Sequence, residues 1–260
     1  MNILFVGDIV GKLGRKALEL NFPNVIEKYN IDFIIANGEN ITNGKGISQS
    51  HYSFLKNLGV DCITLGNHYN HYNETYSFLD NDDILRPLNI KNEKYGSGSR
   101  LFEYKGVKIR VSNLIGTDTI NSEIIMPYDS ILEVISNDES DIHIIDFHAE
   151  YTGEKKALAY SLKNSISAII GTHTHVQTRD YQILSTGPFY ISDVGMCGLY
   201  DGVLGVEKNS CVERIIYQNK NARFKQLEKG SIVFSAIILK FDDISFKPIE
   251  IVPIYNISEV

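Results

Sequence analysis

Short apolar runs alternate with segments of helical periodicity along the first part of the chain. Runs that suit strands buried on both faces occupy residues 3–6, 32–36 and 62–65. Apolar residues three and four apart predict a helix from about residue 15 to residue 29, which Pro23 should kink or restart. A second helix should follow Ser48, whose side chain suits an N-cap, and extend to Leu58. This order of elements predicts an α/β fold.

The remainder of the chain predicts a hairpin, further helices and further strands. Residues 101–104 and 107–111 flank Lys105-Gly106 in the manner of a hairpin with a tight turn. Single strands are expected at 142–147, 167–170, 231–240 and 246–254, helices at 129–137, 153–163 and 212–217, and a glycine-spaced loop at 198–205. An antiparallel pair after parallel units indicates a mixed sheet or a second sheet. Without a linker, repeat or low-complexity tract, we expect one domain over residues 1–260.

Side chains that can bind metal ions follow five of the predicted strands. They are Asp8, Glu39 with Asn40, Asn67 with His68, His148, and His173 with His175. In open α/β sheets, ligands bind outside the carboxyl ends of the strands, so these side chains should gather at one edge. Residues i and i+2 of an extended backbone point to the same side, so His173 and His175 should present their imidazoles together.

The mixture of carboxylate, amide oxygen and imidazole suits Mn, Fe or Zn better than Ca or Mg. Seven of these side chains are candidate ligands, which is more than one ion requires from a protein. Glu39 is placed to lie between two ions, and two metals can clamp a phosphoryl group and activate a hydroxide for in-line attack. Taken singly, Asp8 could be a turn residue, Asn40 an Asx-turn or cap, and His68 a structural histidine. The ordered set favours a metal centre.

The composition limits the classes of molecule that this protein can bind and the compartment in which we expect it. With 25 Lys and Arg against 32 Asp and Glu, the net charge is −7, which argues against stable binding to nucleic acid or to a membrane surface. Cys62, Cys197 and Cys211 are too widely spaced for a disulfide framework or a thiolate zinc site. The first apolar run is too short for a signal peptide and no stretch reaches the length of a membrane span, so we expect a cytoplasmic protein. A homo-oligomer stays open.

Several ordered motifs carry a resemblance to a known family. They are Gly7-Asp8-Ile9-Val10-Gly11, Ala36-Asn37-Gly38-Glu39-Asn40, Gly66-Asn67-His68, Asp146-Phe147-His148-Ala149-Glu150, Gly171 through Gln177, and Asp193-Val194-Gly195-Met196. In this order they resemble the calcineurin-like metallophosphoesterases and, more closely, the YmdB family of bacterial phosphodiesterases. The resemblance implies a four-layer α/β/β/α sandwich of mixed sheets with a di-iron or di-manganese centre.

The resemblance also implies a role for each candidate. The first ion would be held by Asp8, Glu39, Asn40 and His175, and the second by Glu39, Asn67, His148 and His173. His68 matches the position of the general acid, and the family substrates are 2′,3′-cyclic nucleotides such as 2′,3′-cAMP. Where the family commonly has Thr-Trp-Asp this chain has Tyr69-Asn70-His71, and Thr117 replaces a common Arg, so substrate preference stays open. The alternatives are a phosphomonoesterase or nucleotidase, and a regulatory protein with a residual metal site.

Other polar residues receive weaker interpretations. His51, in a predicted helix, and His143, in a predicted strand, should be structural or surface residues. His71 could line the mouth of a substrate site. Asp146 and Asp193 could orient the ligands from behind, and ordinary hydrogen bonding in loops explains them equally well.

Overall fold

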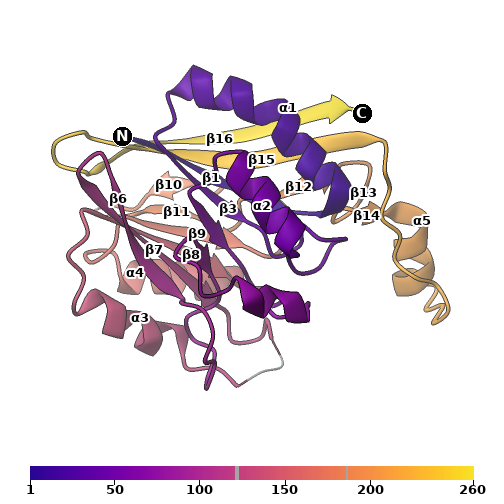
Figure 1. Ribbon diagram of the computed structural model, residues 1–260, viewed down its shortest axis with the longest axis horizontal. Coiled ribbons are helices and arrows are strands. Elements are labelled where there is room, and N and C mark those ends of the chain that lie inside the picture. The colour runs from indigo at the N-terminus through magenta and orange to yellow at the C-terminus, as the bar shows by residue number, and fades with distance from the viewer. Residues whose placement is uncertain (121–122, 186) are drawn as a thin grey trace.

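The computed structural model describes residues 1–120, 123–185 and 187–260, and within them the strands form two large sheets and one small hairpin (Figure 1). The first large sheet contains β1 (Asn2–Val6), β2 (Asp8–Ile9), β3 (Phe33–Asn37), β4 (Cys62–Thr64), β5 (Ile84–Leu85), β12 (Met196–Leu199), β15 (Ser231–Phe241) and β16 (Pro248–Glu259). Its order is β2-β12-β15-β1-β3-β4-β5, with β16 paired to β15. The strands from β1 to β5 in this order are parallel, whereas β15 runs antiparallel to β1, β12 and β16.

The second large sheet has the order β10-β11-β9-β8-β7-β6. Its strands are β6 (Ser99–Tyr104), β7 (Val107–Ile115), β8 (Ile142–His148), β9 (Ala168–Thr172), β10 (Gln182–Ile183) and β11 (Phe189–Ile191). The strands β7, β8, β9 and β11 are parallel, and the outer strands β6 and β10 are antiparallel to their neighbours. Both large sheets are therefore mixed, as predicted.

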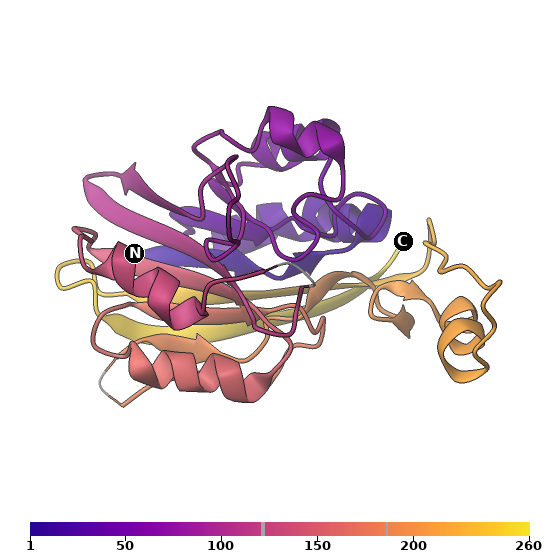
Figure 2. The same ribbon diagram turned by 90° about the horizontal axis from the view of Figure 1, so that it is seen from below.

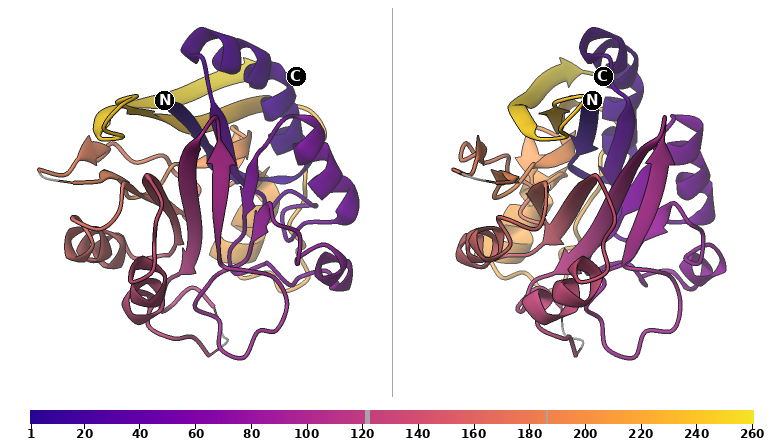
Figure 3. Two further views of the ribbon diagram at one scale, coloured as in Figure 1. Left: turned by 60° about the vertical axis from the view of Figure 1, so that its left-hand side comes forward. Right: turned by 90° about the vertical axis from the view of Figure 1, so that its left-hand side faces the viewer.

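Helices cover the outer face of each sheet, which gives four layers (Figures 2 and 3). The helices α1 (Gly11–Tyr29) and α2 (Gln49–Asn57) pack on the first sheet, and α3 (Pro127–Ile135) and α4 (Thr152–Ser161) pack on the second. Strand β1 shows why this follows from the sequence. Its Leu4 and Val6 face the α1 side, while Ile3 and Phe5 face the core between the two sheets. The predicted α/β/β/α sandwich is confirmed.

The predicted N-cap and hairpin turn are confirmed, whereas the predicted effect of Pro23 on the first helix is not a restart. Ser48 caps α2, with its hydroxyl accepting from the backbone N–H of His51. The 105–106 turn joins β6 to β7, and both of its residues have positive φ, at 49° and 84°, as a tight hairpin turn requires. Pro23 does not restart the first helix, because α1 is continuous through it.

The expected loop at 198–205 is wrong in part. Residues 196–199 form β12 within the first sheet, and β13 (Gly202–Val203) pairs with β14 (Val206–Glu207). The chain then forms the short helix α5 (Lys208–Cys211) and the π-helical turn η2 (Val212–Ile216), which confirms the helical prediction at 212–217. A 3₁₀ helix, η1 (Asn73–Ser77), was not predicted. Among the described residues, none of the helices combines the length and apolar character that crossing a bilayer requires.

Candidate metal centre

The eight predicted site residues converge at one edge of the sandwich, where strands of both sheets end. Asp8 lies in β2, His148 ends β8, and the remaining six follow strands of either sheet: Glu39 and Asn40 after β3, Asn67 and His68 after β4, and His173 and His175 after β9. A cavity of about 320 Å³ opens beside them. Glu39 and Asn40 are buried and line this cavity, whereas Asp8 and His148 are buried and are not among its lining residues.

One group of side chains surrounds Asp8. The Nδ2 atom of Asn40 lies 3.5 Å from Asp8 Oδ1 and 3.2 Å from His175 Nε2, and His175 Nε2 lies 3.9 Å from Asp8 Oδ1. The same Nδ2 donates to Glu39 Oε1 at 2.8 Å. The two ends of a carboxamide are nearly equal in size, so a half-turn about χ2 presents Asn40 Oδ1 to the same space. These four side chains are those assigned to the first ion by the family resemblance.

A second group surrounds His148, whose Nε2 lies 3.3 Å from Glu39 Oε1, 3.1 Å from Asn67 Oδ1 and 3.0 Å from His173 Nδ1. The donor atoms of Glu39, His148 and His173 all lie within 4.8 Å of one another. Glu39 therefore contacts both groups, as the prediction of a shared carboxylate requires.

The expectation that His173 and His175 lie on extended backbone is wrong. Their φ angles are +107° and +66°, so the chain turns sharply directly after β9. The turn is held by the backbone N–H of His173, which donates to Asp8 Oδ2, and by that of Thr174, which donates to Asp193 Oδ2. The two imidazoles still reach the site, where His173 contacts His148 and His175 contacts Asp8.

Side chains behind the site fix the orientation of His148. Its Nδ1 lies 2.9 Å from Thr172 Oγ1, and that hydroxyl donates to Asp146 Oδ1 at 2.7 Å. Because the hydroxyl hydrogen goes to Asp146, the Thr172 oxygen is left to accept from His148 Nδ1–H. The lone pair of the neutral ring is then on Nε2, which faces the other donors. Asn37 Nδ2 extends this series of hydrogen bonds by donating to Asp146 Oδ2.

Glu150 has the corresponding role for His173, because its Oε2 lies 3.3 Å from His173 Nε2 on the side away from His148. Asp193 acts on the turn itself, since it accepts from the backbone of Thr174 and pairs with the buried amine of Lys155 at 3.1 Å. The structure therefore supports the orienting interpretation of Asp146 and of Asp193. Sequence reasoning missed Glu150, Thr172 and Lys155 as contributors, although the first two lie inside quoted motifs.

Burial and charge perturb the titration of the cluster in opposite directions. Burial raises the pKa of Asp8, and His175 and His148 offset part of that rise. Burial also favours the protonated form of Glu39, but the charges and hydrogen bonds of His148 and His68 outweigh it and hold the pKa of Glu39 well below its usual range. For His148 burial is outweighed by Glu39 and Asp8, which raise its pKa to about 9. Burial and repulsion from His148 lower the pKa of His173 to about 3.

These contacts fit a site for cations. When His148 is neutral with its proton on Nδ1, its Nε2 lone pair faces Glu39 Oε1 and Asn67 Oδ1, which are also acceptors. The raised pKa of His148 shows that this position attracts positive charge, which a proton on Nε2 supplies when no metal ion is bound. Acceptor atoms at such distances repel unless a proton or a metal ion lies among them. Gly66 keeps the space open, because a Cβ there would overlap Glu39 Oε2 and His148 Nε2. The donor set, with two carboxylates, two amides and three imidazoles, suits Mn, Fe or Zn.

His68 is placed differently from the ligand candidates. Its side chain is 26% exposed and lines the cavity, with Nδ1 3.0 Å from Asn40 Oδ1 and 3.3 Å from Glu39 Oε1. Its backbone N–H donates to Glu39 Oε2 at 3.1 Å, which ties the residue to the site. His68 can therefore reach a molecule in the cavity while remaining in contact with the buried donors.

The three remaining histidines lie outside the two groups of candidate ligands. His143 is buried between Ser112 Oγ and Asp138, and His51 contacts the hydroxyls of Thr42 and Ser48, so both are structural. His71 is exposed, with its ring centroid 6.2 Å from that of His68.

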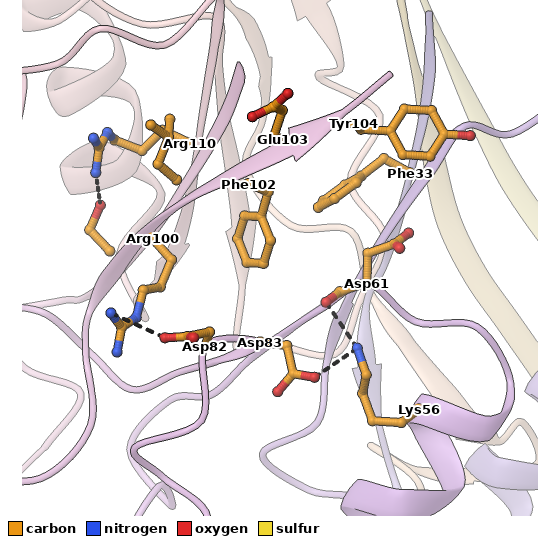
Figure 4. Close-up of a pocket in the computed structure, with 12 residues that line it drawn as sticks. Phe33, Lys56, Asp61, Asp82, Asp83, Arg100, Phe102, Glu103, Tyr104 and Arg110 are labelled. Atoms are coloured by element: carbon orange, nitrogen blue, oxygen red, sulfur yellow. Dashed lines mark hydrogen bonds and ion pairs between the residues drawn. The ribbon is translucent and has the colours of Figure 1, made fainter. Parts of the chain in front are cut away.

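A larger hollow of about 700 Å³ lies between β6 and the start of β3 (Figure 4). The candidate metal ligands Glu39 and Asn40 follow the other end of β3. Several of the charged groups of the hollow are paired with one another. Lys56 bonds to Asp83 and to the backbone oxygen of Asp61, and Arg100 pairs with Asp82 at 3.4 Å. It lacks the convergent donors of the strand-end cavity, which is the better candidate for chemistry despite its smaller size.

Comparison with known proteins supports the resemblance. Residues 4–254 match the family described as YmdB-like protein. The chain is 38% identical over 254 residues to a protein of Bacillus subtilis named 2′,3′-cyclic-nucleotide 2′-phosphodiesterase, covering 96% of this chain and 95% of that protein.

Two solved structures share the whole fold. A phosphatase of Mycoplasma pneumoniae is 34% identical, with a TM-score of 0.93 over 100% of this chain and 94% of that one. A hypothetical protein of Thermus thermophilus is 33% identical, with a TM-score of 0.91 over 99% of each chain.

Proposed function

Because this chain belongs to the YmdB-like family and is a metallophosphoesterase, we propose that it hydrolyses small phosphodiesters, with 2′,3′-cyclic nucleotides as substrates, at the strand-end cavity. The observation that carries the proposal is the convergence of Asp8, Glu39 and His148, all buried, with two further histidines and two amides, several of which line that cavity. The name of the Bacillus subtilis relative supports the choice of substrate.

The donor set divides into two ion sites that share Glu39. Asp8, Asn40 and His175 would complete the first, and Asn67, His148 and His173 the second. Iron and manganese are the proposed metals, with zinc as the alternative. When bound, two such ions supply Lewis-acid stabilisation of a phosphoryl group and lower the pKa of water.

His68 is the proposed general acid. Opening a cyclic phosphodiester breaks one P–O bond, and the departing ribose oxygen must take up a proton. His68 is the histidine of this cluster that lines the cavity without belonging to either proposed ion site, and its contact with Glu39 and Asn40 keeps the ring directed to the reaction centre. The chain thereby separates metal binding from proton donation.

The walls of the cavity favour a diester over a monoester. None of the described residues lining it is Lys or Arg. The dianion of a phosphomonoester usually requires such cations around its free oxygens. A diester carries one charge less at phosphorus, which two metal ions can balance.

The substrate is tested by loading purified protein with Mn²⁺ or Fe²⁺ and comparing turnover of 2′,3′-cAMP with that of 5′-AMP. We expect the cyclic substrate to be preferred, and a tenfold or greater preference for the monoester would refute the proposal. His68→Ala should retain metal and lose about 10²–10⁴-fold in kcat. His71→Ala is the matched control and should keep activity, since His71 is exposed and is not among the residues that line the cavity. Loss of metal in His68→Ala would contradict the assigned role.

A further inference from the structure

The segment 208–229, here called the arm, projects from the sandwich at one end of the molecule (Figures 1 and 2). It consists of α5, η2 and the segment that returns to β15. Large apolar side chains on the arm face solvent: Ile215 is 55% exposed, Ile216 67%, Tyr217 68% and Phe224 55%. If each exposes roughly 100 Å², they reach the size of apolar patch that monomers rarely leave uncovered.

The arm is also basic. It contains six Lys or Arg residues and two Glu, whereas the whole chain has a net charge of −7. A surface that covers the arm should therefore combine apolar contact with acidic neighbours.

Such a surface exists between α3 and α4. An apolar groove of about 330 Å³ is lined there by Met126, Tyr128, Phe147 and Leu158 among others. Met126 is 55% exposed and Tyr128 42% exposed.

The helices that border the groove are acidic, with Asp129 and Glu133 on α3 and Glu154 on α4. Of the two lysines on α4, Lys155 is buried against Asp193 and Lys156 lies over the ring of Tyr190. The groove and the arm are thus complementary in both charge and apolar character.

The arm cannot fill the groove of its own chain. Both views place α3 and α4 at the end of the molecule opposite α5 (Figures 1 and 2). A second copy offers the same groove, and in a two-fold symmetric pair any contact between the arm of one copy and the groove of the other is formed twice.

We propose that two copies of this chain form a symmetric dimer in which the arm of each docks in the α3–α4 groove of the other. Ile216 and Tyr217 supply the apolar contact, and Arg214 and Arg223 face the acidic side chains of α3 and α4. The exchange forms two equivalent contacts, so the assembly closes at two chains rather than growing into a filament.

Sedimentation velocity and light scattering on the full chain test the proposal at micromolar concentration. The wild type should have twice the 29.3 kDa chain mass. Ile216→Asp in the arm and Met126→Glu in the groove should each raise the dimer dissociation constant at least tenfold. Both residues are exposed, so circular dichroism and melting temperature should not change. The matched control is Ile244→Asp, at a residue 90% exposed in the turn between β15 and β16, which should leave the dimer intact.

Mixing the two variants distinguishes this arrangement from others. The arm of Met126→Glu and the groove of Ile216→Asp are both unchanged, so a mixed pair retains one of its two contacts. We expect mixing to restore dimers. A monomeric wild type, a dimer insensitive to either variant, or failure of the mixture to associate would overturn the proposal. If the mixture failed to associate and only Ile216→Asp lost the dimer by itself, the two arms would contact each other rather than the groove.

Discussion

Thr172→Val tests whether the side chains behind the candidate metal centre determine its metal affinity. Valine has nearly the same shape, so the change removes the hydroxyl that links His148 Nδ1, at 2.9 Å, to Asp146 Oδ1, at 2.7 Å. All three residues are fully buried, and water cannot replace the lost partner without a cavity. The ring of His148 then loses the contact that keeps its proton on Nδ1.

The magnitude follows from these contacts. Removal of a residue that orients a metal-binding histidine typically weakens metal binding by about 10–100-fold, which corresponds to roughly 1.4–2.7 kcal/mol. Loss of the hydroxyl that contacts the buried atoms Asp146 Oδ1 and His148 Nδ1 should also lower the free energy of unfolding by about 1–3 kcal/mol. We expect both effects in the same variant.

The assay is titration calorimetry of the metal-free protein with Mn²⁺, with urea unfolding measured in parallel. Thr174→Val is the matched control, because among the described residues Thr174 makes its hydrogen bond to Asp193 through the backbone N–H, which valine retains. Metal affinity within twofold of the wild type in a folded Thr172→Val protein would refute the reasoning. So would an equal loss of affinity in the control.

Three further changes probe the site and its support. Gly66→Ala should abolish metal binding in a chain that still folds, since its Cβ would overlap the donor atoms; normal metal content by mass spectrometry would contradict this. Lys155→Met should lower the free energy of unfolding in urea by about 3–5 kcal/mol, because it leaves buried Asp193 unpaired; a change below 1 kcal/mol would show that the ion pair is not needed. Burial and the charge of Arg15 lower the pKa of His51 to about 4. The unfolded chain therefore takes up the proton first as pH falls from about 6.5 toward 4, which should cost roughly 1–2 kcal/mol after allowance for solvent exposure. Relative to pH 7.5, unfolding at pH 5 should show a smaller loss in His51→Asn, and an identical loss would be contrary evidence.

The long strands could be predicted because burial on both faces leaves a direct mark on the sequence. The runs at 3–6 and 142–147 became β1 and β8 with small changes at their ends. The two-residue strands β2, β5 and β10 are too short to produce an apolar run in the sequence. They are strands because they pair with neighbouring strands. The expected loop at 198–205 failed for the same reason, since β12 is defined by its pairing with β15.

The position of the candidate site was also readable, since each strand that ends in a polar residue delivers it to one edge of the fold. The local geometry was not. The positive φ of His173 and of His175 depends on hydrogen bonds to Asp8 and Asp193, and nothing in the sequence near residue 173 encodes a contact with residue 8. The support of His148 by Thr172 likewise depends on the register of β8 and β9, which place the two residues side by side.

The position of β15 in the first sheet has a consequence for synthesis on the ribosome. This strand is inserted between β12 and β1, so the sheet lacks a central strand until residues 231–241 emerge. Asp8 follows β1 by two residues, but its own strand β2 pairs with β12, and β12 pairs with β15. A nascent chain therefore completes the sheet pairing around Asp8 only after its last strands have been made.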